Sequence, residues 1–280
     1  MRARFIYGAL LVGLLSTGAC TQMKNGEKKA AEGTEIEKLP MSIDILNAKN
    51  NYKVTDSVLR SECYMTVSTT VQWPVSIGDF DIKPLQDTII AMAFPDSKSK
   101  EIDKAIKDYV DDIASYELGS KAVRIDTVPT VSAFNNIYYN TVNLTLAEIS
   151  DETVTYNLMF NQYMGGAHPQ WGSMPFSYDF ATKSVIDNEW LFKPDSSDKL
   201  AAIISETIAG NLDLKPEELN RILLVDKIPV SECVYIENGE IVFHYNPYAI
   251  LPYSFGEVNA SISPYSVEWL LTDQARKLLL

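Results

Sequence analysis

The sequence predicts an α+β protein with a mostly antiparallel sheet, helices packed on that sheet, and two associated subdomains. Strand-like segments occur in neighbouring pairs joined by short turns, and helical segments are grouped between these pairs. This order is typical of antiparallel sheets and not of alternating β-α-β units. The chain has 280 residues, of which 46% are hydrophobic, so it can bury a sizeable core.

The first half of the body is expected to contain a long strand region and two helices. Residues 52–75 are rich in Val, Ser and Thr, which favours strands, and Pro74 and Gly78 end this region. Residues 85–94 suit a short helix. Residues 100–118 place apolar side chains at intervals of three and four, with Asp and Lys between them, which predicts an amphipathic helix.

Two hairpins have clear local signals. Residues 137–149 alternate between apolar and polar side chains, and a turn at 150–152 separates them from a second strand at 153–163. Residues 231–236 and 240–245 flank Glu237-Asn238-Gly239, and Asn-Gly between apolar runs is a strong hairpin signal. The remaining expected elements are strands at 174–180 and 258–262 and helices at 197–209, 216–223 and 265–271.

The amino terminus has the features of a bacterial secretion signal. Arg2 and Arg4 precede an apolar stretch at 5–15, which has the length of a signal-peptide core and is short for a membrane span. The small residues before Cys20 resemble a lipobox, although Thr17 stands where a hydrophobic residue is usual. We therefore expect a signal peptide at 1–19 and lipidation of Cys20, the alternative being a plain signal peptide cleaved near Ala19.

Residues 20–48 are expected to form a lipid-anchored flexible tether, because the stretch after Cys20 is polar and lacks an apolar period. The protein is then an exported, membrane-anchored lipoprotein of the bacterial cell envelope, on the periplasmic or surface side. Two domains are expected to follow, an N-terminal α+β region at 49–160 and a C-terminal α+β domain at 161–280.

The charge of the chain restricts its partners. The net charge is −13, and because the leader contains two arginines and no acid, the mature form would reach −15. An acidic surface disfavours nucleic acid, which requires clusters of Lys and Arg, and it permits a cationic protein partner. Acidity is equally a means of staying soluble.

Little catalytic or metal-binding chemistry is evident. Cys63 and Cys233 lie in strand-like sequence, and in an exported protein they can either form a disulfide or remain as buried thiols. Neither has the close Cys or His neighbours of a metal site, so no metal and no cofactor are expected.

A glycine pair and a tyrosine-rich loop are the candidate ligand contacts. Gly165 and Gly166 follow a strand and precede His168, which is either an acid–base or ligand-contacting residue or a structural residue that holds the turn. Tyr245, Tyr248 and Tyr253 lie among prolines and a glycine, and they form either a binding platform or a staple onto the core.

Five motifs carry a resemblance to a known family: Tyr163-x-Gly165-Gly166-Ala167-His168, Phe176-x-Tyr178-Asp179-Phe180, Leu191-Phe192, Tyr245-Asn246-Pro247-Tyr248 with Pro252-Tyr253-x-x-Gly256, and Ile262-Ser263-Pro264-Tyr265. Over about 160–270 the chain resembles the extracytoplasmic domain shared by the lysozyme-sensing anti-sigma factor RsiV and the peptidoglycan deacetylase PdaC. The resemblance implies a module without catalysis of its own, here as a stand-alone lipoprotein.

Three hypotheses for function follow. The first is a non-catalytic envelope module that binds a protein, such as the cationic lysozyme, or a cell-wall glycan such as peptidoglycan. The second is a structural envelope lipoprotein without a small-molecule site. The third is a glycan-acting hydrolase that uses His168 with a neighbouring acid such as Asp179.

Overall fold

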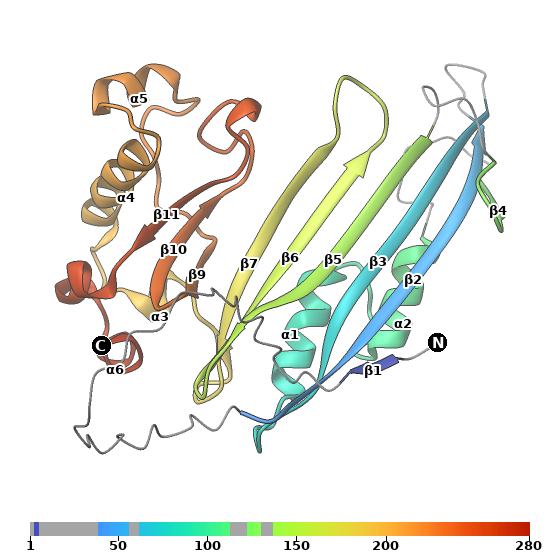
Figure 1. Cartoon of the computed structure of the whole chain (residues 1–280), viewed down its shortest axis with the longest axis horizontal. Coiled ribbons are helices and arrows are strands. Elements are labelled where there is room, and N and C mark those ends of the chain that lie inside the picture. Colours follow the sequence, from blue (N-terminus) through green and yellow to red (C-terminus); the bar gives the residue numbers. More distant parts are fainter. Residues whose placement is uncertain (1–2, 6–38, 56–61, 113–121, 130–136) are drawn as a thin grey trace, which may run out of the picture.

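The chain folds into two packed units, a large N-terminal sheet with two helices and a smaller C-terminal unit (Figure 1). The structure is a computed structural model that describes residues 3–5, 39–55, 62–112, 122–129 and 137–280. The expected α+β class and the two subdomains are confirmed.

The large sheet has the order β1-β2-β3-β5-β6-β7-β8, with β4 also paired to β2. Every neighbouring pair is antiparallel except β3 and β5, which run parallel. The strands are β1 (Ala3–Phe5), β2 (Met41–Thr55), β3 (Glu62–Ile77), β4 (Ala122–Ile125), β5 (Ile137–Ile149), β6 (Thr153–Tyr163), β7 (Gln170–Asp179) and β8 (Ser184–Val185).

Helices α1 (Lys83–Ala93) and α2 (Ile102–Asp111) cover one face of this sheet. Leu85, Ile89 and Ile106 of these helices pack on strand residues that include Leu144 and Tyr156. The spacing of four between Leu85 and Ile89 places both side chains on the buried side of α1. This apolar layer forms the core of the N-terminal unit.

Over β3, β5 and the far half of β6 the opposite face of the sheet is polar, and most of its side chains are at least partly exposed. Along β3, Met65, Val67 and Val71 are fully buried under the helices, whereas the alternating residues Ser68 and Thr70 are partly exposed. Such alternation is typical of a sheet with one face on the core and one in water.

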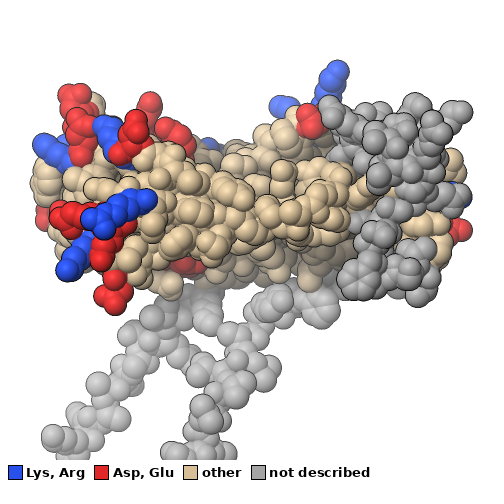
Figure 2. Space-filling model, turned by 90° about the horizontal axis from the view of Figure 1, so that it is seen from above, with Lys and Arg blue, Asp and Glu red and all other residues tan. Residues whose placement is uncertain are grey.

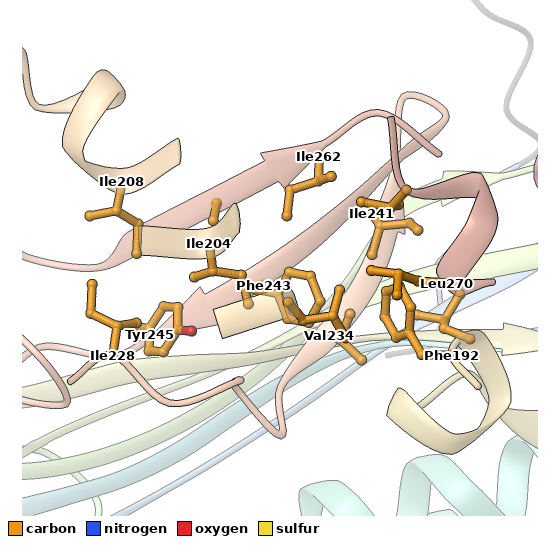
Figure 3. Packing of buried hydrophobic residues seen from close by; sticks show 14 of the residues in the cluster. Phe192, Ile204, Ile208, Ile228, Val234, Ile241, Phe243, Tyr245, Ile262 and Leu270 are labelled. Carbon is orange, nitrogen blue, oxygen red and sulfur yellow. The ribbon is translucent and has the colours of Figure 1, made fainter. Parts of the chain in front are cut away.

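The C-terminal unit packs its own helices on a three-stranded sheet in the order β11-β10-β9. Figure 3 shows Phe243 at the centre of its core, among Ile204, Val234 and Phe192. The unit contains α3 (Asn188–Leu191), α4 (Ser197–Asn211), α5 (Pro216–Ile222), β9 (Val234–Glu237), β10 (Glu240–Tyr245), the 3-10 helices η1 (Tyr253–Phe255) and η2 (Pro264–Leu270), β11 (Val258–Ile262) and α6 (Asp273–Leu279).

Both predicted hairpins form where the sequence placed them. Asn238 and Gly239 have φ angles of 52° and 74°, as a tight two-residue turn requires. In the other turn, the Ser150 hydroxyl accepts hydrogen bonds from the backbone N–H groups of Glu152 and Thr153 at 3.2 and 3.0 Å.

Several expected boundaries are different in the structure. Residues 41–48, assigned to the tether, form the first half of β2, because their backbone pairs antiparallel with β3 from Met41 opposite Ile77 onward. The expected division at 160/161 falls inside β6, and the two cores instead separate near residue 186. The expected strand at 52–75 is mostly β3, and α2 is followed by residues 113–121, which lie outside the described chain.

Residues 1–2 and 6–38 also lie outside the described residues. They include Cys20, the expected tether up to residue 38, and all of the expected signal peptide except β1. Among the described helices, none has the length and apolar character needed to cross a membrane. Strand β4 and helix α6 were not expected from the sequence.

The cysteines considered for a disulfide are both free thiols. Cys63 lies on β3, 3.9 Å from the Tyr138 hydroxyl, whereas the Cys233 thiol lies 3.4 Å from the Pro175 carbonyl oxygen on β7. Strands β5 and β6 lie between β3 and β7. At about 4.8 Å per strand, this separation exceeds the roughly 7 Å between Cα atoms that a disulfide can span.

We expect thiol titration of residues 21–280 to find two free thiols after denaturation without a reductant. In the native protein both should react slowly, because Cys63 is buried and burial raises the pKa of Cys233 to about 12, which leaves little thiolate. A sample reduced beforehand is the control and should give the same count. A count of zero before reduction would contradict the structure.

Candidate functional site

At one of the contacts between the two units, the side chain of Asn246 meets the outer edge of β7. Its amide oxygen accepts a hydrogen bond from the backbone N–H of Ser173 at 2.7 Å, and its amide nitrogen donates to the Ser173 carbonyl oxygen at 2.9 Å. The side chain thus replaces a neighbouring strand at this edge and satisfies both backbone groups. This pairing of Asn246 with Ser173 holds the loop after β10 beside β7, and we call it the joint.

Gly172 makes this approach possible. A Cβ atom at residue 172 would lie 2.3 Å from the Asn246 amide oxygen and 2.7 Å from Cζ of Phe160. Both distances are shorter than any ordinary contact, so only glycine fits between the two side chains. The contact of the Asn-Pro motif with β7 therefore requires Gly172, a dependence that no local pattern in the sequence predicts.

The joint brings His168, which lies before β7, against the tyrosines after β10. The ring centroids of His168 and Tyr253 are 4.1 Å apart with an interplanar angle of 23°, and those of His168 and Tyr248 are 6.3 Å apart. The two tyrosine centroids are 5.4 Å apart. Tyr248 is 55% exposed and His168 is also exposed, so the group faces solvent.

Trp171 connects these rings to the sheet. Its indole N–H donates a hydrogen bond to the Tyr253 hydroxyl at 2.9 Å, and that hydroxyl donates to the Pro169 carbonyl oxygen at 3.2 Å. We call His168, Trp171, Tyr248 and Tyr253 the aromatic cluster. It consists of three residues that the sequence predicted as ligand contacts, together with Trp171, which no local pattern in the sequence singles out.

The glycine pair shapes the turn and does not line the cluster. Gly165 and Gly166 have φ angles of 94° and 104°, which other residues rarely adopt. The Tyr163 hydroxyl donates a hydrogen bond to the Gly166 carbonyl oxygen at 3.0 Å and closes the turn. The glycines thus place His168 at the tip of the β6–β7 hairpin.

Tyr245 belongs to the core and not to the site. Its ring is buried in the C-terminal unit, and its hydroxyl donates a hydrogen bond to the Pro229 carbonyl oxygen at 2.6 Å. Burial raises its pKa above the ordinary value. In the tyrosine-rich loop, Tyr245 is therefore a core residue that anchors the loop, whereas Tyr248 and Tyr253 form an exposed surface.

A buried polar group around His244 lies directly below the loop. His244 Nδ1 is 2.7 Å from the Asn259 amide oxygen, and Nε2 is 3.3 Å from the Ser173 hydroxyl and 3.8 Å from a Glu257 carboxylate oxygen. The order Ser, His, Asn resembles a hydrolytic triad. However, Ser173 and His244 are each only 3% exposed, so a substrate does not reach the hydroxyl in this structure.

The pairing of His168 with Asp179 that a hydrolase would need is not formed. His168 precedes the first residue of β7 and Asp179 is its last residue, so the two lie at opposite ends of the strand. Asp179 instead accepts a hydrogen bond from the backbone N–H of Thr182 at 2.8 Å and holds the turn before β8.

A hollow of about 870 Å³ lies elsewhere, between α2 and the helix-covered face of the sheet. Its rim includes Lys104 and Asp108, which pair with each other at 3.1 Å along α2. None of the predicted site residues lines it. We therefore take the aromatic cluster as the candidate functional site.

Comparison with known proteins supports the fold and gives no activity. Residues 189–265 match the model of a family described as "Protein of unknown function (DUF3298)". This segment lies within the C-terminal unit and includes Tyr248 and Tyr253 but not His168 or Trp171. No curated protein matches the chain.

Two solved structures of proteins described as DUF3298 family members have a similar fold over most of this chain. A member of the DUF3298 family from Bacteroides fragilis is 17% identical, with a TM-score of 0.63, and the match covers 85% of this chain and 96% of that chain. A DUF3298 family protein from Pseudomonas aeruginosa is 14% identical, with a TM-score of 0.56, and the match covers 85% and 97%. At this identity the likeness concerns the fold alone.

We expect Gly172→Ala to lower the free energy of unfolding by about 1–3 kcal/mol, because the added methyl group must displace Asn246 or Phe160. Urea unfolding followed by tryptophan fluorescence measures the change. The matched control is Gly210→Ala in α4, where a Cβ would meet no atom within 4 Å. The control should leave stability unchanged or raise it by up to about 1 kcal/mol. Equal effects of the two substitutions would contradict the proposed joint.

Proposed function

We propose that this protein is a non-catalytic binding module of the bacterial cell envelope, anchored through a lipid on Cys20, that holds a cell-wall glycan at its aromatic cluster. The observation that carries the proposal is the exposed and pre-stacked arrangement of His168, Tyr248 and Tyr253. Aromatic faces held in place by other contacts offer large contact area at a low cost in conformational entropy.

The surroundings of the cluster favour a neutral ligand. The loop from residue 241 to 256 and the hairpin from 153 to 178 contain no Asp, Glu, Lys or Arg. Figure 2 looks down on the end where these loops lie and shows charged side chains gathered over the C-terminal unit, with an uncharged middle. A phosphate or carboxylate ligand would need Arg or Lys here, whereas sugar rings stack on aromatic faces without them.

A cationic protein such as lysozyme is the second candidate, and a different observation favours it. Residues 187–280 contain 15 acidic and 7 basic residues, so the C-terminal unit is itself strongly acidic. An acidic surface speeds and strengthens association with a basic partner at low salt. In this case the acidic surface, and not the aromatic cluster, would carry the interaction.

Binding of residues 21–280 to purified peptidoglycan and to lysozyme, at low and moderate salt, separates these candidates. We expect Tyr248→Ala to weaken peptidoglycan binding by roughly 2- to 10-fold, because one aromatic contact contributes about 0.5–1.5 kcal/mol. The matched control is Tyr265→Ala, since this tyrosine is 70% exposed on η2 and outside the cluster.

Binding to lysozyme that weakens with salt and ignores Tyr248→Ala would support the second candidate. Binding to neither partner would leave a structural envelope lipoprotein as the remaining hypothesis. Loss of peptidoglycan binding in both tyrosine variants would point to a general change and contradict a site at the cluster.

A further inference from the structure

The polar face of the large sheet begins at the aromatic cluster, because Trp171 of the cluster lies on that face. Trp171 pairs across the strands with Asn161, Asn161 with Thr141, and Thr141 with Ser68. Because paired residues share one face of a sheet, these four side chains form a row across β7, β6, β5 and β3. One end of the row is the tryptophan that holds Tyr253.

A second row runs parallel to the first. Ser173 pairs with Met159, Met159 with Asn143, and Asn143 with Thr70. The C-terminal unit covers only its first member, since Ser173 is buried at the joint whereas Met159 is 43% exposed. We call Ser68, Thr70, Thr141, Asn143, Met159 and Asn161 the open face; the C-terminal unit and the aromatic cluster border it along β7.

The strand segments that carry the open face contain no charged residue, and the nearest charges are Glu62 and Glu148 near strand ends and Lys49, which pairs with Ser68 from β2. Residues 63–78, 137–147 and 153–178 contain no Asp, Glu, Lys or Arg, although charged residues make up 22% of the chain. A solvent-exposed strand face of this length would ordinarily include charges, which promote solubility and oppose association. Hydroxyl and amide groups take their place here, and each of them both donates and accepts hydrogen bonds.

We propose that the open face is the continuation of the glycan site and binds a neutral polysaccharide chain that lies across β6, β5 and β3, with one end stacked on the aromatic cluster. The inference rests on the proposed function and extends it from a single sugar contact to a polymer. Amides such as Asn161 and Asn143 suit the hydroxyl and N-acetyl groups of such a chain, and an ionic ligand would find no counter-charge among the six residues of the open face.

The hydrogen bonds already present hold the face in shape for a ligand. The Ser68 and Thr141 hydroxyls are 3.3 Å apart, and the Asn143 amide oxygen accepts from the Thr70 backbone N–H at 3.0 Å. Polar groups fixed in this way lose little conformational entropy when a ligand binds. Four strands at about 4.8 Å spacing make a row of roughly 14 Å, which is long enough for several linked sugars.

Calorimetric titration of residues 21–280 with the β-1,4-linked hexamer and dimer of N-acetylglucosamine tests the proposal. We expect the hexamer to bind at least tenfold more tightly than the dimer. The double variant Thr141→Ala, Asn161→Ala should weaken hexamer binding about tenfold and leave dimer binding unchanged, whereas Tyr248→Ala should weaken both. Asn220→Ala, on the exposed side of α5, is the matched control and should change neither.

The outcomes separate this proposal from the function on which it rests. If the double variant binds the hexamer as the wild type does while Tyr248→Ala weakens both ligands, the extension is overturned and the cluster remains the site. If neither oligomer nor peptidoglycan binds the wild type, the proposed function fails and the extension with it. If sedimentation shows a dimer that the double variant dissociates, a second copy of this chain occupies the open face and the proposal is wrong.

Discussion

The pairing of the Asn246 amide with the backbone of Ser173 is the interaction on which the position of the tyrosine-rich loop beside β7 depends. It satisfies two backbone groups at the edge of β7, where leaving them unpaired would be costly. Gly172 permits the close approach, and His244, Glu257 and Asn259 fill the space behind it. A loop held at its base in this way can present exposed rings in a fixed geometry.

The functional surfaces follow from this joint. The loop after β10 is fixed against β7, so Tyr253 stacks on His168, and its hydroxyl accepts a hydrogen bond from the Trp171 indole N–H. The C-terminal unit covers the near part of the polar face and stops at Met159, and most side chains of that face beyond Met159 are at least partly exposed. The joint therefore determines where the aromatic cluster forms, and the contacts of Ile236 on β9 with Thr155 and Ser177 hold the C-terminal unit over the near part of the sheet.

The distribution of charge gives the two units different chemical characters. Acidic residues outnumber basic ones by about two to one in residues 187–280, whereas residues 63–78, 137–147 and 153–178, which carry the open face, contain none of either sign. The overall net charge of −13 hides this division. Carboxylates thus define the chemistry of the C-terminal surface, whereas hydroxyl, amide and aromatic groups define the chemistry of the open face and the cluster.

The sequence by itself determined the elements whose signals are local: the β5–β6 hairpin, the Asn238-Gly239 turn, and the amphipathic stripe of α2. These depend on periodicity and turn chemistry within a few residues. Only the tertiary structure decided that Tyr245 is buried while Tyr248 is exposed, that β3 pairs in parallel with β5, and that the two cysteines stay apart. It also placed His168 beside Tyr248, 80 residues away. Such contacts depend on how distant segments pack together, and the physical forces behind them leave no periodic pattern in the chain.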